Sequence, residues 1–210
     1  MSGGYTLFGR PGSGSAICEA ILSLTGLPYK LIEFGNWEQN APPPALLAVS
    51  PLAQLPALVL PDGETMTESA AIALYLADLE PKAGLAPSAN DPQRARYLRW
   101  MLYLAAQSYP TALRIHYPER HTVDPSGAAA VKQAAVARSA FEWQVFSGAL
   151  GDGPFILGDS MSAADLYAAM LTSWDLDQKA LYDRHPNIKR LCMQVALVPP
   201  VREIWLRLGI

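Results

Sequence analysis

Short apolar runs alternate with helix-like segments in the first third of the chain. Apolar residues run together or alternate in three strand candidates, which are 6–8, 29–33 and 57–60. Between and after them, apolar residues recur at helical spacing over 15–24 and 67–78. The sequence LPDGE at 60–64 has turn chemistry, because proline favours the first bend and glycine accepts positive φ. We therefore expect a βαβ beginning followed by two antiparallel strands and a helix.

Beyond residue 92 the pattern predicts only helices. Asp91 and Pro92 suit a helix start, because Asp accepts from free amides and Pro needs no donor in the first turn. Pro110 is expected to end or kink that helix. Further helical patterns cover 126–149, 162–174 and 186–197, with a short one after Pro200.

The two patterns predict two domains. The proline-rich segment PKAGLAPSANDP at 81–92 has little periodicity, as is typical of an interdomain connection. We expect an α/β domain over 1–80, a linker over 81–90 and an all-helical domain over 91–210.

Composition narrows the classes of partner. Half of the 210 residues are apolar and the formal net charge is −3, which gives no broad basic field for nucleic acid or an acidic membrane. The two cysteines, Cys18 and Cys192, are far apart, so we expect no disulfide framework and a reducing compartment. No metal is expected, because the three histidines lack ligand spacing. Without a secretory signal or membrane span in the sequence, a cytoplasmic protein is predicted whose partner is a small molecule or another protein.

The sequence SMSAAD at 160–165 has a strong helix-capping signal. Ser162 can accept from the amide of Asp165 while the Asp165 carboxylate accepts from the amide of Ser162, and Met161 and Leu166 can pack as the flanking apolar pair. Asp165 is therefore predicted to be structural and not catalytic.

The sequence GRPGSGSAIC at 9–18 lies between a predicted strand and a predicted helix. Glycines there allow a ligand to approach, and the free amides of a helix start can face an anion. The glycine spacing does not match a dinucleotide-binding loop. From this stretch alone, a solvated glycine and serine turn is the other interpretation.

Taken together, the segments SPLAQLPALVLPDGETMTESAAIALYLAD and SMSAAD resemble the cytosolic glutathione transferases over nearly the whole chain. The similarity is greatest to bacterial members that use serine or cysteine near the first helix. It implies a thioredoxin-like amino-terminal domain that binds glutathione and an all-α domain that supplies much of the electrophile pocket. It also implies a homodimer.

The resemblance assigns the peptide contacts of glutathione. It implies a cis peptide bond before Pro56, which would expose the backbone of Leu55 for pairing with the cysteinyl part of the tripeptide. It also implies that the helix start at Glu68 and Ser69 receives the γ-glutamyl group, and Gln54 is a weaker candidate contact. On their own residues, Pro56 could start a strand in the trans form, and Thr-Glu-Ser could be a plain helix cap.

The resemblance also assigns the thiolate contact to a serine. Ser13 matches the position of the serine in serine-type relatives, and Ser15 is the second candidate. Gly14 falls where cysteine-using relatives carry their cysteine, which disfavours mixed-disulfide chemistry. Tyr5 is a weaker candidate for a tyrosine-type mechanism.

The resemblance places part of the electrophile pocket on the first long helix of the helical domain, which implies two weak pocket candidates. Tyr103 and Tyr109 lie on its first long helix, where aromatic residues more often belong to the core. The predicted activity is conjugation of glutathione to a small electrophile. A noncatalytic protein of this fold, or a glutathione-dependent reductase, isomerase or ether-cleaving enzyme, are the alternatives.

Overall fold

The chain forms two compact units. The structure is a computed structural model that describes residues 4–35 and 41–210. The first unit extends to Asp91 and also contains Val195–Ile210, whereas the second covers Pro92–Gln194. The expected boundary near residue 91 coincides with this division. The expected single domain over 91–210 does not account for the return of the last residues to the first unit.

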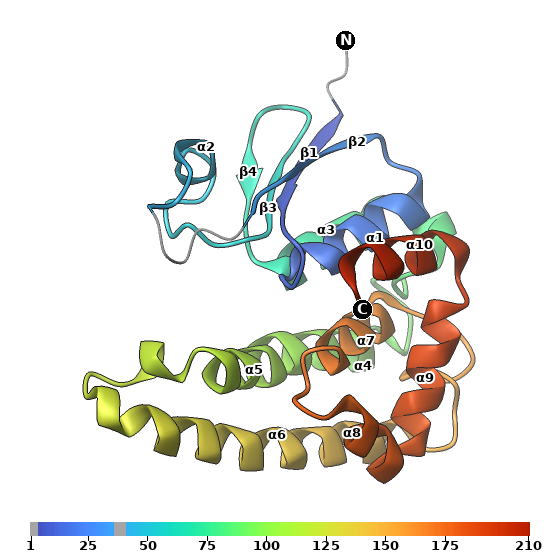
Figure 1. Cartoon of the computed structure of the whole chain (residues 1–210). Helices are drawn as coiled ribbons and strands as arrows, with labels where there is room; N and C mark the ends of the chain where they lie inside the picture. The colour runs from blue at the N-terminus through green and yellow to red at the C-terminus, as the bar shows by residue number, and fades with distance from the viewer. Residues whose placement is uncertain (1–3, 36–40) are drawn as a thin grey trace. The chain divides into compact units, whose positions relative to one another are not determined.

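A four-stranded sheet forms the centre of the first unit (Figure 1). Its strand order is β2-β1-β3-β4, with β1 parallel to β2 and β3 antiparallel to both β1 and β4. The strands are β1 (Tyr5–Gly9), β2 (Tyr29–Glu33), β3 (Ala57–Val59) and β4 (Thr65–Met66). The expected turn joins the last two, where the Gly63 amide donates to the Leu60 carbonyl and Gly63 has φ 93°.

Three helices cover the sheet of the first unit. Helices α1 (Ser15–Thr25) and α3 (Ser69–Leu79) pack side by side, and α10 (Pro199–Leu208) packs against α1 (Figure 1). Their apolar faces and the sheet share one core, because side chains on both are fully buried. Examples are Leu7, Ile17, Ile21, Leu58, Ile72 and Leu76. A short helix, α2 (Pro44–Leu47), and a 3-10 turn over Pro81–Ala83 complete this unit.

The second unit is built from helices, with one isolated antiparallel bridge between Phe155 and Gly158 among its described residues. Its helices are α4 (Arg94–Tyr103), α5 (Tyr109–His116), α6 (Ala128–Leu150), α7 (Ala163–Thr172) and α8 (Gln178–Arg184), with most of α9 (Pro186–Ala196). Short 3-10 turns lie at Pro118–His121 and Pro125–Gly127. The first helix begins at Arg94 and not at Asp91–Pro92, and its N-cap is Gln93. Asp91 lies three residues before the first residue of this helix.

Pro110 changes the helix as expected. A π-helical segment over Leu104–Ser108 joins α4 to α5, and the Tyr109 amide donates to the Leu104 carbonyl five residues earlier. Pro110 has no amide hydrogen to continue the ordinary ladder, so the helix widens where the proline enters it.

The described part of the chain contains neither a membrane-spanning helix nor a cluster of metal-ligating side chains. None of its helices is long and apolar enough to cross a membrane. Within those same residues, no group of three or more His, Cys, Asp or Glu side chains is arranged to hold a metal ion.

Candidate functional site

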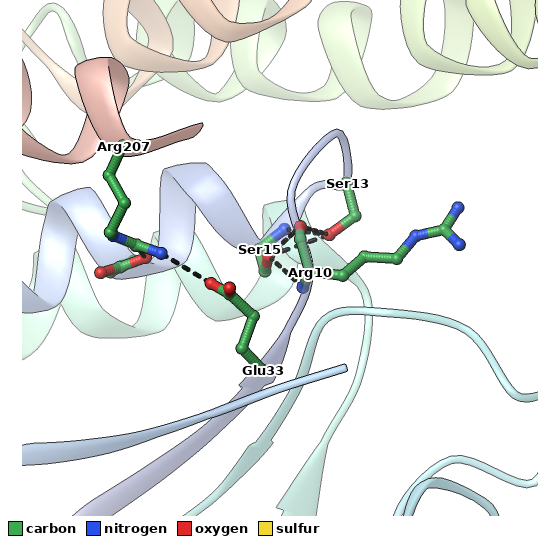
Figure 2. A network of polar contacts seen from close by, with 6 residues as sticks. Arg10, Ser13, Ser15, Glu33 and Arg207 are labelled. Carbon is green, nitrogen blue, oxygen red and sulfur yellow. Dashed lines mark hydrogen bonds and ion pairs between the residues drawn. The ribbon is translucent and has the colours of Figure 1, made fainter. Parts of the chain in front are cut away.

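Two buried serines form the centre of the loop between β1 and α1, which we call the serine loop (residues 10–15). Ser13 and Ser15 are 7% and 4% exposed, and their hydroxyl oxygens lie 2.9 Å apart (Figure 2). The Ser13 hydroxyl donates to the Arg10 carbonyl at 2.8 Å, and the Ser15 hydroxyl lies 3.2 Å from the same oxygen. The two serine side chains are therefore buried, whereas Pro11 and Gly12 of the same loop are exposed.

Backbone groups contact both serine hydroxyls. The Arg10 amide donates to the Ser15 hydroxyl oxygen at 3.2 Å. A Cβ at Gly9 would lie 2.6 Å from that oxygen, so the strand passes close to Ser15 because residue 9 is glycine. The Ser15 amide in turn donates to the Ser13 hydroxyl oxygen at 3.3 Å. Each hydroxyl thus has two backbone contacts, and the shortest of the four joins the Ser13 hydroxyl to the Arg10 carbonyl.

Tyr5 lies at the other end of β1 from the serine loop. It is the first residue of that strand, whereas Gly9 is the last, and a strand rises about 3.3 Å per residue. Burial, and then a hydrogen bond with Tyr75, raises the pKa of the Tyr5 hydroxyl. A phenol that is distant from the loop and harder to ionise does not fit the tyrosine-type role.

The Leu55–Pro56 bond lies beside the start of the serine loop. The bond is cis, so the trans alternative is wrong. Ala57 pairs with Phe8 in the antiparallel β1–β3 register. Pro56, the residue before Ala57, therefore comes opposite Gly9, the residue after Phe8. Among the described residues, the Leu55 backbone amide and carbonyl make no hydrogen bond. They are available to pair with an added peptide strand.

Helix α3 starts without a side-chain cap. Glu68 is the N-cap residue, and its side chain makes no capping hydrogen bond. The Glu68 backbone has φ 66° and ψ 103°, which is rare for a residue with a Cβ. Such a conformation costs on the order of 1–3 kcal/mol and recurs at ligand-binding sites. Ser69 beside it is buried.

Cys18 joins the starts of α1 and α3. Its buried sulfur lies 3.7 Å from the Gly14 carbonyl and 3.8 Å from the Ser69 carbonyl. Burial raises the pKa of the Cys18 thiol well above its usual range, so Cys18 is a packing residue and no nucleophile. The serine loop and the head of α3 are therefore neighbours at one end of the sheet.

The remaining predicted contacts lie in two different places. Gln54 is exposed next to Leu55, and its backbone amide donates to the Ser50 hydroxyl at 3.1 Å. In the second unit, the Tyr103 hydroxyl donates to the Glu142 carbonyl at 3.0 Å, and burial raises the pKa of Tyr103 to about 12. Tyr109 packs edge-on against Trp174 at 5.0 Å between ring centres. Both tyrosines thus contact neighbouring helices of their own unit.

The capping box at the head of α7 is confirmed. The Asp165 carboxylate accepts from the Ser162 amide and hydroxyl, both at 2.8 Å, and from the Ile156 amide at 2.7 Å. Burial raises the pKa of Asp165 to about 6 although these three hydrogen bonds lower it. With its acceptors in use, Asp165 is a structural residue.

One charged network beside the serine loop was not predicted. Arg207 on α10 forms ion pairs with Glu19 on α1 and with Glu33 at the end of β2 (Figure 2). The available signal was Glu19, the one charged residue within the apolar sequence SAICEAILSLT. A buried charge needs a partner, but nothing local identifies that partner as Arg207.

Comparisons with known proteins agree with this geometry. The family model described as the glutathione S-transferase N-terminal domain matches residues 15–79. A solved glutathione transferase homologue from Sulfitobacter, with bound glutathione, is 25% identical with a TM-score of 0.88 and covers 99% of both chains. A sphingomonad glutathione S-transferase complexed with glutathione is also 25% identical, with a TM-score of 0.81 and 98% and 99% coverage. The fold is thus a thioredoxin-like sheet unit with a helical unit.

A full-length relative establishes the family. An uncharacterized glutathione S-transferase-like protein of Escherichia coli K12, YncG, is 30% identical over 202 residues, which are 96% of this chain and 97% of that protein. The chain therefore belongs to the glutathione S-transferase family.

Proposed function

We propose that this protein is a glutathione transferase in which the Ser13 hydroxyl stabilises the thiolate of glutathione. The observation that carries the proposal is the buried Ser13–Ser15 pair, 2.9 Å apart, next to the cis Leu55–Pro56 bond and the uncapped head of α3. The glutathione bound to the Sulfitobacter and sphingomonad relatives supports this choice of ligand.

The tripeptide lies across the end of the sheet in this proposal. The backbone of Leu55 pairs with its cysteinyl residue as an added strand would, and Gln54 contributes a weaker contact. The γ-glutamyl carboxylate meets the Ser69 hydroxyl and the amides at the head of α3, where the helix dipole favours an anion. The negatively charged Glu68 side chain holds the positively charged α-ammonium group of the same γ-glutamyl residue.

The serine acts as a hydrogen-bond donor and not as a base. When glutathione binds, the Ser13 hydroxyl turns from the Arg10 carbonyl to the sulfur, while the Ser15 hydroxyl keeps that carbonyl partnered at 3.2 Å. A hydrogen bond to a charged group contributes about 1.5–3 kcal/mol, which lowers a thiol pKa by roughly one to two units. Thiolate is then abundant near neutral pH.

The reaction then follows ordinary nucleophilic chemistry. The thiol proton passes to solvent, and the sulfur electron pair forms a bond to an electrophilic carbon. A leaving group departs with its bonding pair, or a double bond takes up a proton from water. Positioning and stabilisation of the sulfur anion supply the rate enhancement.

The second unit provides the electrophile pocket in this proposal, with Tyr103 and Tyr109 as its candidate residues. A homodimer and a cytoplasmic location are further expectations carried by family membership. Sedimentation of the purified protein tests the first, and fractionation of the source cells tests the second.

An ultraviolet titration of bound glutathione tests the proposal. Wild-type protein should bind glutathione and lower its thiol pKa toward about 7, and Ser13→Ala should raise that pKa by roughly one to two units with binding retained. Ser88→Ala, at an exposed serine of the same unit, is the matched control.

Three outcomes would contradict the proposal in whole or in part. No binding at millimolar glutathione would exclude glutathione as the ligand. Binding without turnover on a panel of electrophiles, unaffected by Ser13→Ala, would instead support a noncatalytic role. If Ser15→Ala alone raises the thiol pKa, the donor is Ser15 and the roles of the two serines are exchanged.

A further inference from the structure

We propose that Arg207 on the last helix is a positioning residue for the serine loop. This inference rests on the proposed function, because it concerns the same two hydroxyls. Arg207 Nη1 lies 2.6 Å from Glu33 Oε2, and Arg207 Nη2 pairs with Glu19 Oε2 (Figure 2). One guanidinium thereby ties α10 to both α1 and β2.

Glu19 and Glu33 lie on the two elements that border the serine loop. Glu19 follows Ser15 by four residues on α1, so the two side chains share a face of that helix. Glu33 pairs with Gly9 in the β1–β2 register, and the Phe34 amide donates to the Gly9 carbonyl at 2.8 Å. The loop begins at the next residue, Arg10.

The distances inside the loop leave little room for the two elements to move apart. The Arg10 amide and carbonyl, at the end of β1, contact the Ser15 hydroxyl on α1 at 3.2 Å each. The carbonyl of Arg10 also accepts from Ser13 at 2.8 Å. A shift of α1 relative to β1 therefore changes the hydrogen bonds of both hydroxyls together.

The two ion pairs, with Glu19 and with Glu33, require an arginine at position 207. The Glu19 side chain is 9% exposed, whereas the side chains of Glu33 and Arg207 are 39% and 40% exposed. Burial raises the pKa of Glu19, while the Arg207 guanidinium and the Tyr29 hydroxyl lower it. A planar guanidinium can bond two carboxylates with separate nitrogens, which a lysine ammonium does less well. Without it, Glu19 is a buried acid beside a second acid, and α1 must move or Glu19 must protonate.

Amide hydrogen exchange of the protein without glutathione tests the positioning directly. In Arg207→Met, the Arg10 and Ser15 amides should exchange about tenfold faster than in wild type, because their hydrogen bonds open more often. Arg202→Met removes the same charge from an exposed position of the same helix, and Arg202 makes none of the ion pairs found among the described residues. It should leave those amides unchanged. Equal exchange in the two variants would overturn the inference.

Steady-state kinetics separate positioning from stability. We expect Arg207→Met to lower kcat about tenfold with KM for glutathione changed less than about twofold, and to move the acidic limb of the kcat–pH profile to higher pH. The double variant Glu19→Met/Arg207→Met replaces the buried acid and its partly exposed counter-ion by apolar side chains and should regain unfolding stability. It should not regain kcat or slow exchange. If the double variant recovers unfolding stability, kcat and slow amide exchange together, Arg207 has only a structural role.

Two further measurements cover the cases in which Arg207→Met does not fold or the wild-type protein does not bind glutathione. If Arg207→Met does not fold, Arg207→Lys retains the charge without the fork and should show the same changes to a smaller degree; wild-type kinetics and exchange in Arg207→Lys would overturn the inference. If wild-type protein does not bind glutathione, the proposed function fails, and the exchange measurement alone still decides whether Arg207 orders the serine loop.

Discussion

Two buried helix starts in this protein use serine in opposite ways. At the head of α7, the Ser162 hydroxyl and the amides of Ser162 and Ile156 all donate to the Asp165 carboxylate. The polar groups of this cap therefore bond to one another. At the head of α1, the Ser13 and Ser15 hydroxyls contact the same Arg10 carbonyl and each other, and the serine loop contains no carboxylate. An ionised acceptor fixes its donors, whereas a hydroxyl on a neutral carbonyl can exchange partners at low cost.

The contrast explains why one serine cluster is structural and the other is a candidate for binding an anion. A carboxylate at the α1 start would repel a thiolate and would compete for the serine protons. Its absence from the sequence GRPGSGS leaves the two hydroxyls able to face a negative ligand. Three substitutions sharpen this comparison.

Asp165→Asn should give the largest effect, and on stability alone. An amide NH₂ would face the Ser162 amide or hydroxyl, which are themselves donors, so the free energy of unfolding should fall by about 3 kcal/mol. Urea denaturation measures the loss. Asp159→Asn, at an exposed position before the cap, is the control and should change little. If Asp165→Asn were as stable as the control, the closed cap would not be holding α7.

Gly9→Ala should disturb the serine loop itself. The new Cβ would meet Ser15 Oγ at 2.6 Å and Ser15 Cβ at 2.7 Å, and Ser15 sits on helix backbone that cannot yield easily. We expect about 2 kcal/mol of lost stability and a bound thiol pKa that returns toward the free value. Gly35→Ala adds a methyl group into open space and serves as the control. Unchanged thiol ionisation in Gly9→Ala would argue against Ser15 as part of the site.

Glu68→Gly should change stability and binding in opposite directions. Glycine accepts φ 66° without strain, so unfolding should cost about 1 kcal/mol more, while loss of the carboxylate weakens glutathione binding. Glu68→Gln keeps the strain and loses the charge, so it should weaken binding without the gain in stability. Denaturation and calorimetric titration measure the two quantities. A variant that is both more stable and equally tight would remove Glu68 from the site.

Locally encoded features were predictable from the sequence. The β2 strand over 29–33, the turn at Gly63 and the Ser162–Asp165 cap all depend on residues within a few positions of one another. Helix α8 was not predicted, because seven residues give too little periodicity to recognise. Helix α4 starts at Arg94, three residues after Asp91.

Features that depend on distant residues were not predictable. The φ angle of Glu68 has no sequence signature, because glycine is the residue normally expected there. The approach of Ser69 to Cys18 follows only once α1 and α3 are packed together. The ion pair of Glu19 with Arg207 joins positions that no local pattern relates.

The return of Val195–Ile210 to the first unit also has a consequence for synthesis. Arg207 is 188 residues later in the chain than Glu19. At about 5–20 residues per second, a ribosome needs roughly 10–40 s to travel that distance. During this interval the nascent first unit lacks α10 and the counter-ion of its buried acid. Its maturation is thereby coupled to completion of the helical unit that is translated in between.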